Sequence, residues 1–194
     1  MQTRRIIAAG SLTLLGGCGV VHSTVLRADY ETVDKTRTVR VVVVTSPLPD
    51  GKQAVGQLWS EIARHYANDH RDFIVKSAVA GPTEPPGLCS EGVEGVLHLV
   101  PKVKLAGAGV EEQVTATLTR CRDSEVVWRA EAGGSWSTYD EYVKDVIGHY
   151  VTELGEEVRP YVAPTYHLMK ATLDAMPKPQ LDENGKGEKI DLTD

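Results

Sequence analysis

Apolar and polar residues alternate over the central third of the chain, a pattern typical of strands that bury one face. The alternation covers three segments, Val96–Leu105, Val114–Arg122 and Glu125–Ala132. A glycine-containing turn at Gly107–Gly109 separates the first two segments, and the Asp123-Ser124 pair separates the last two. This spacing predicts a three-stranded antiparallel meander.

Two more apolar runs predict strands nearer the N-terminus. Thr38–Thr45 contains four consecutive valines, which suits a central strand covered on both faces, and Asp72–Val79 has the composition of a short second strand. Between these runs, apolar residues recur at helical spacing from Ala54 to Tyr66. We therefore expect an amphipathic helix that ends near Asn68.

The segment that follows the meander carries helical periodicity. Thr138 and Glu141 have the spacing of a capping box, and the apolar stripe after them runs to Val158. Pro160 is expected to end this helix, because proline cannot donate the next backbone hydrogen bond. Thr165 can then cap a shorter third helix.

The element order β-α-β-β-β-β-α-α predicts an α+β fold, in which helices pack on one face of a mostly antiparallel, five-stranded sheet. We assign residues 36–176 to this single globular domain. Residues 18–35 show no sustained period and are interpreted as a spacer. Residues 177–194 are charged and poor in apolar side chains, which indicates a flexible acidic tail.

Residues 1–17 have the three-part anatomy of a secretory signal. Arg4 and Arg5 precede an apolar run, Ile6–Leu15, that is too short to span a bilayer, which needs roughly 20 residues. Leu15-Gly16-Gly17-Cys18 resembles the lipobox of bacterial lipoproteins. The resemblance implies that cleavage leaves Cys18 as a lipidated first residue; the alternative is a plain secreted protein with a cysteine at the cleavage site by chance.

Lipidation would fix where the protein resides. Two or three acyl chains, at about 0.8 kcal/mol per buried methylene, hold a protein at a bilayer almost permanently. We expect a membrane-anchored protein on the periplasmic side, and Gly19 after the lipidated cysteine favours the outer membrane by resemblance to bacterial sorting rules. The net charge is −6, and loss of Arg4 and Arg5 makes it more negative, which argues against nucleic acid or anionic headgroups as partners.

Besides Cys18, only Cys89 and Cys121 remain, an even pair in an oxidising compartment. A disulfide between them would close a loop of about 30 residues and contribute roughly 3–4 kcal/mol. Two unpaired thiols are the alternative. We expect no metal here, because no histidine lies beside either cysteine at a ligand spacing.

The sequence holds no motif that indicates catalysis or a cofactor. The glycines of Gly107–Glu112 lack the third position of a dinucleotide loop, and His65 and His70 are five apart, off one helical face. We therefore expect no enzyme, no cofactor and no metal. Adjacent carboxylates are interpreted as solvated faces and caps; they occur at Glu111-Glu112, Asp140-Glu141 and Glu156-Glu157.

The block Val96–Trp136 resembles small lipoproteins of myxobacteria and related bacteria, a family of unknown function. The resemblance rests on Leu97-His98-Leu99, Thr115-Ala116-Thr117-Leu118 and the run from Asp123 to Ala130. The hairpin is also similar to the α/β domains of the curli-secretion lipoprotein and of penicillin-binding-protein activator lipoproteins. These likenesses imply a periplasmic binding or assembly role and transfer no functional residue.

Three hypotheses on function follow. The first is a non-enzymatic envelope accessory that docks another envelope protein through its sheet edge or helix face. The second is a small-ligand or lipid carrier in which tryptophans and a proline-rich loop line a cavity, namely Trp59, Trp128, Trp136 and Gly81–Gly92. The third is an envelope hydrolase that uses Ser135 and a distant histidine.

Overall fold

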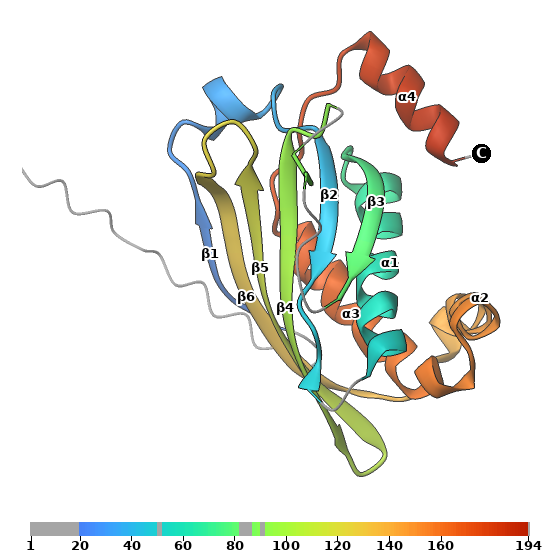
Figure 1. The fold of residues 1–194 in the computed structure, drawn as a ribbon. Helices are drawn as coiled ribbons and strands as arrows, with labels where there is room; N and C mark the ends of the chain where they lie inside the picture. The colour runs from blue at the N-terminus through green and yellow to red at the C-terminus, as the bar shows by residue number, and fades with distance from the viewer. Residues whose placement is uncertain (1–19, 50–51, 82–86, 90–91, 194) are drawn as a thin grey trace, which may run out of the picture.

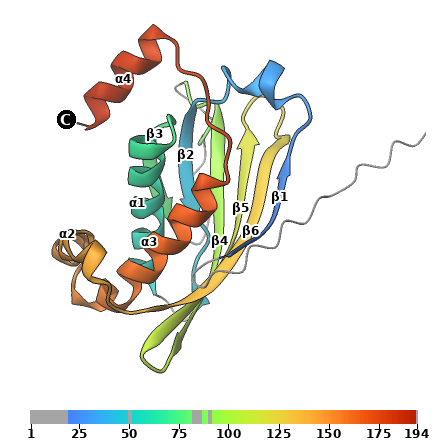
Figure 2. The same cartoon turned by 180° about the vertical axis from the view of Figure 1, so that it is seen from behind.

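The computed structural model describes residues 20–49, 52–81, 87–89 and 92–193; the signal segment and Cys18 lie outside them. Helices cover one face of a single sheet, as Figures 1 and 2 show from opposite sides. The strands are β1 (Val20–Leu26), β2 (Arg40–Thr45), β3 (Ile74–Ala80), β4 (Gly95–Ala106), β5 (Gly109–Arg120) and β6 (Val126–Ser137). The longer helices are α1 (Gln53–His70), α2 (Lys144–Leu154), α3 (Arg159–Asp174) and α4 (Glu183–Thr193), and the short ones are η1 (Tyr30–Asp34), η3 (Glu141–Val143) and η4 (Glu156–Val158). None of the described helices is both long and apolar enough to span a membrane.

The α+β class and the meander are confirmed. Strands β4, β5 and β6 pair antiparallel over nearly their full lengths. Their two turns hold residues with positive φ, Gly107 at 61° and Ser124 at 59°. Glycine adopts that conformation readily and serine does so at a cost, so the second hairpin carries local strain.

The predicted five-stranded, mostly antiparallel sheet needs correction. The sheet is mixed and has six strands in the order β1-β6-β5-β4-β2-β3. Strand β2 runs parallel to both β3 and β4. Helix α1 carries the chain back along the sheet, so β3 begins at the same end of the sheet as β2. The valine run of β2 therefore lies between two parallel neighbours, the position that its continuous apolar character favours.

The sixth strand comes from the predicted spacer. Residues of β1 pair antiparallel with β6 and close that edge of the sheet. The segment after β1 is packed as well, because Asp34 of η1 is buried and accepts hydrogen bonds from the Arg120 guanidinium at 3.1 and 3.2 Å. The alternation in β1 is weak, with Val25 64% exposed, so periodicity alone missed this strand.

Helices α2 and α3 begin and end at residues other than those predicted. Gly155, with φ 98°, follows the last residue of α2, and Pro160 lies in the first turn of α3 instead of ending a helix. Proline suits a first turn because the backbone N–H that it lacks has no partner there. The predicted capping box is also wrong, since the carboxylate of Asp140 accepts the Tyr142 N–H at 2.9 Å.

A helix occupies most of the segment predicted to be a flexible tail. Helix α4 lies at the edge of the sheet beside β3 (Figure 1). Glu188 of α4 pairs with Arg40 at 2.8 Å and with Lys76 at 2.9 Å. This segment is poor in apolar residues, so its sequence shows no helical periodicity and does not predict a helix that ion pairs hold in place.

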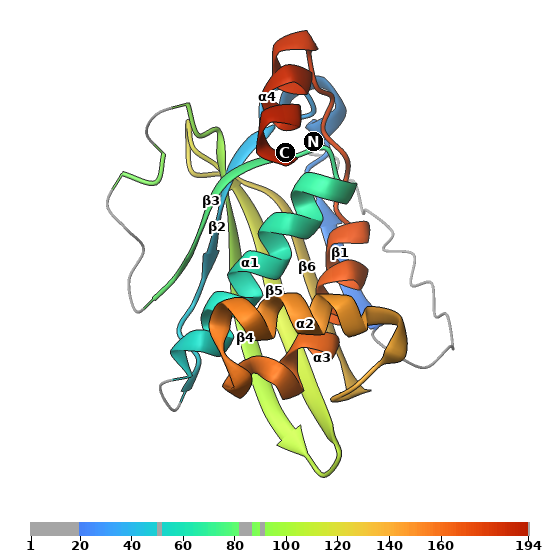
Figure 3. The ribbon, with the colours of Figure 1, turned by 90° about the vertical axis from the view of Figure 1, so that its right-hand side faces the viewer.

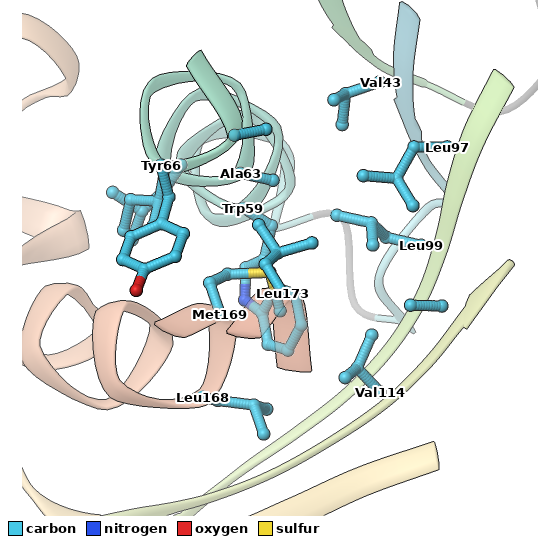
Figure 4. Close-up of a cluster of buried hydrophobic side chains, with 14 of the residues drawn as sticks. Val43, Trp59, Ala63, Tyr66, Leu97, Leu99, Val114, Leu168, Met169 and Leu173 are labelled. Atoms are coloured by element: carbon cyan, nitrogen blue, oxygen red, sulfur yellow. The ribbon is translucent and has the colours of Figure 1, made fainter. Parts of the chain in front are cut away.

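The core lies between the sheet and the layer of α1 and α3. Figure 4 shows side chains of both helices directed toward the strands. Trp59, Trp128 and Trp136, which the carrier hypothesis places around a cavity, are all buried in this core. The three indole N–H groups have no hydrogen-bond partner among the described residues.

Cys89 and Cys121 form a disulfide in the structure, with their Cα atoms 5.4 Å apart. The bond joins the loop before β4 to the turn between β5 and β6. Replacing both cysteines with alanine is expected to lower the free energy of unfolding by about 3 kcal/mol, because the reduced unfolded chain gains loop entropy. Urea unfolding of the double variant measures this, and reduction of the wild-type protein by dithiothreitol should give the same loss. An unchanged midpoint in both experiments would contradict the bond.

Candidate functional site

Helix α2 crosses α1 and α3 (Figure 3). A surface cavity of about 370 Å³ is lined by residues of these three helices. We call it the helix pocket. Its buried and half-buried lining consists of Ile62, His65, Tyr66, Val146, Tyr150 and Tyr166. Its exposed rim consists of Asp69, His70, Asp145 and His149.

Helical spacing explains why these residues meet. Ile62, His65, Tyr66 and Asp69 of α1 are three or four residues apart and so occupy one face of that helix. The four α2 residues of the lining are also three or four residues apart, namely Asp145, Val146, His149 and Tyr150. His70 completes the rim although it is five residues from His65, because it is four residues from Tyr66 and its ring lies 4.6 Å from the Tyr66 ring.

His65 is held in one neutral form. The Arg64 guanidinium lies 2.6 Å from Nε2 and can only donate, so Nε2 accepts and Nδ1 donates to the Tyr150 hydroxyl at 2.6 Å. Burial lowers the pKa of His65, and the charge of Arg64 lowers it further. Both ring nitrogens make hydrogen bonds, so His65 lines the cavity as an uncharged ring in a fixed orientation.

Aromatic rings contact one another around the cavity. The ring of His149 lies 4.9 Å from that of Tyr150 and 5.9 Å from that of His65. On the other side, Tyr66 lies 6.2 Å from Tyr166 in an edge-on arrangement. Such contacts stabilise the orientation of the rings that line the cavity.

Two carboxylates face the cavity without a partner. Neither Asp69 nor Asp145 makes a hydrogen bond or an ion pair with any residue that the structure describes. Their acidic neighbours differ, since Glu61 pairs with Arg64 at 2.7 Å and Glu153 lies 3.5 Å from His149. The rim is therefore negative, and its charge is not cancelled within the pocket.

The lining of the helix pocket includes no serine, cysteine or lysine that could act as a nucleophile. In the described parts of the chain, no group of three or more histidine, cysteine or acidic side chains could hold a metal ion. Aromatic rings, imidazoles and carboxylates of this kind can bind a ligand.

Ser135, the residue of the hydrolase hypothesis, lies apart from the helix pocket. It is exposed on β6 and lines a groove that His22 of β1 also lines. No hydrogen bond joins Ser135 to a histidine within the described segments. The structure therefore places a serine and a histidine in one groove without the contact that would activate the hydroxyl.

Glu112 is the titratable residue that sequence reasoning placed wrongly. It is fully buried beneath α3, where Thr165 donates a hydrogen bond to Oε1 at 2.9 Å and Oε2 has no partner among the described residues. Burial without a positive neighbour raises the pKa of Glu112 to about 8. The signal was present, because positions 110, 114, 116 and 118 of the same strand are apolar and Glu112 shares their face.

The sequence matches no protein-family model, and no curated protein matches it. Among solved structures, the PelC dodecamer of Paraburkholderia phytofirmans matches with 16% identity and a TM-score of 0.42, over 75% of this chain and 98% of that one. A methionine variant of the same PelC dodecamer matches with 15% identity and a TM-score of 0.45, over 80% of this chain and 95% of that one.

Proposed function

We propose that this protein is a non-enzymatic accessory of the bacterial envelope, anchored through lipid on Cys18 at the periplasmic side of the outer membrane. It binds another envelope protein through the helix pocket. The signal segment and the lipobox-like sequence at Cys18 support the location. The observation that carries the binding role is the helix pocket itself, which is open and aromatic and whose rim carboxylates have no partner in the described part of the chain.

The arrangement of the chain is compatible with a tethered binding module. Strand β1 follows the anchor segment directly and forms one edge of the sheet, while α1 packs over β2 and β3 near the other edge (Figure 1). The helix pocket, between α1 and the helices next to it, is thus well separated from β1. A partner can reach the pocket while the N-terminus stays at the bilayer.

Replacement of Cys18 by serine tests the anchor. The variant is expected to leave the membrane fraction and appear in the soluble periplasmic fraction, because it loses the acyl chains that hold it. Mass spectrometry of the wild-type mature protein should show a first residue at Cys18 with added acyl mass. A wild-type chain that begins elsewhere, or carries no acyl group, would contradict the proposed location.

Site-specific photo-crosslinking tests the binding role. A photoreactive phenylalanine at position 166, in the helix pocket, should give one discrete adduct in intact cells. The same residue at position 105, exposed in the β4–β5 hairpin, serves as the control and should not. The adduct at position 166 should disappear when Asp69 and Asp145 are both changed to asparagine. Equal adducts at both positions would contradict a specific site.

A further inference from the structure

The negative rim and the aromatic lining of the helix pocket together restrict the chemistry of its ligand. Asp69 extends from α1 and Asp145 from α2, so the two free carboxylates border the cavity from different helices. Tyrosine and histidine side chains make up much of the remaining lining. A cation gains from both features at once, by ion pairing with the carboxylates and by attraction to the ring faces.

The chain already binds an ammonium group in this way beside the pocket. Lys170 Nζ lies 5.7 Å from the centroid of the Tyr66 ring and 2.8 Å from the Asp174 carboxylate. Asp174 and the Tyr66 hydroxyl raise the pKa of Lys170. Lys170 and Asp174 are four residues apart on α3, so the helix also positions this lysine. The helix pocket offers similar groups, two aspartates with no partner among the described residues and several rings.

We infer that the helix pocket binds a lysine or arginine side chain presented by the partner protein. This inference rests on the proposed function, of which it specifies the partner's chemistry. The cavity volume of about 370 Å³ accommodates one such side chain, and its buried floor of Ile62, Tyr66 and Tyr150 suits the aliphatic stem. An anionic ligand would meet the carboxylates unfavourably, because no lysine or arginine lines the pocket.

Peptide titration of the mature lipidated protein in nonionic detergent tests the inference. The probe is the capped tripeptide Gly-Lys-Gly, and the matched neutral probe carries norleucine in place of lysine. Two-dimensional NMR of the labelled protein gives both the affinity and the location of binding. We expect a dissociation constant of about 1–10 mM for the lysine peptide, at least about tenfold weaker binding of the norleucine peptide, and shifts confined to α1, α2 and α3.

Two double variants separate local from overall charge. Asp69→Asn with Asp145→Asn should weaken lysine binding about tenfold, because both ion pairs are lost. Glu111→Gln with Glu157→Gln removes the same charge from exposed positions outside the pocket and should change affinity less than about twofold. Neither Asp69 nor Asp145 makes a hydrogen bond or ion pair with a described residue, so circular dichroism should show nearly unchanged thermal midpoints.

The outcomes divide clearly. No lysine binding, equal binding of norleucine, or equal weakening by both double variants would overturn the inference. If photo-crosslinking yields an adduct but the lysine peptide does not bind, the proposed function stands and the inference fails. If the lysine peptide binds and no partner is captured in cells, the pocket's preference for a cationic side chain stands, and the proposed function, with a partner that presents the side chain, fails.

Discussion

The protein is expected to lose stability as the pH rises from about 5 to 8, and replacement of Glu112 by glutamine should abolish most of that loss. The cause is the buried Glu112 carboxyl, which has a pKa of about 8 in the folded chain against an ordinary value of 4.5. Between these values the folded state keeps a proton that the unfolded state has released. Stability therefore falls by about 1.4 kcal/mol per pH unit in this window, by several kcal/mol in total.

The direction follows from linkage. The contribution of Glu112 is fully present below pH 4.5 and is lost as the pH passes 8, because the folded-state pKa is raised. His65 acts in the opposite direction at more acidic pH, since its pKa is lowered in the folded protein. The Glu112→Gln variant isolates the first effect, because it keeps the shape of the side chain and cannot ionise.

Urea unfolding at pH 5, 6, 7 and 8 measures the effect. The slope of unfolding free energy against pH should be steep in the wild-type protein and shallow in Glu112→Gln. Glu111→Gln is the matched control, since Glu111 is the exposed neighbour on the same strand and should leave the slope unchanged. A Glu112→Gln variant with the wild-type slope would show that this carboxyl is not buried as described.

Replacement of Trp59 by alanine should lower the free energy of unfolding by about 3–5 kcal/mol. Trp59 of α1 is completely buried and belongs to the same cluster as Met169 and Leu173 of α3 (Figure 4). The variant loses the transfer free energy of the ring and leaves a cavity between helices and sheet. The indole N–H has no partner among the described residues, so the substitution leaves no acceptor unpaired. Removal of this unpaired donor is favourable and offsets only part of the lost packing free energy.

Chemical denaturation with circular dichroism detection suits this comparison. Trp59→Phe fills most of the space and should cost less than half as much as Trp59→Ala. Tyr142→Ala, at a position that is 97% exposed, should leave the midpoint unchanged. Should Trp59→Ala unfold at the wild-type urea concentration, the packing of α1 against the sheet would be refuted.

Binding measurements on the same variants would bear on the carrier hypothesis. A carrier with a tryptophan-lined cavity would show changes in indole fluorescence when its ligand is removed. The three indoles lie inside the core instead, so their emission should stay that of buried tryptophan under all native conditions. The aromatic residues left to meet a ligand are the tyrosines and histidines of the helix pocket.

The candidate site could be predicted only in part. Each of its three helices is expected from periodicity, although the first is expected to end near Asn68, before His70. The separation of five residues between His65 and His70 argues against a shared site, because it does not place the two histidines on one face of a single helix. The helix pocket exists because α2 crosses α1 and α3, and nothing in the spacing of His149 or Asp145 reports that crossing.

The sequence by itself determined the meander, the helix after the first central strand, and most inward and outward positions. These features depend on periodicity and turn chemistry within about ten residues, so a local pattern encodes them. Tertiary structure alone decided the pairing of β1 with β6, the docking of α4 through Glu188, and the removal of Glu112 from water under Thr165. Each of these joins segments far apart along the chain, and their energies come from strand pairing, ion pairing and burial that no single segment contains.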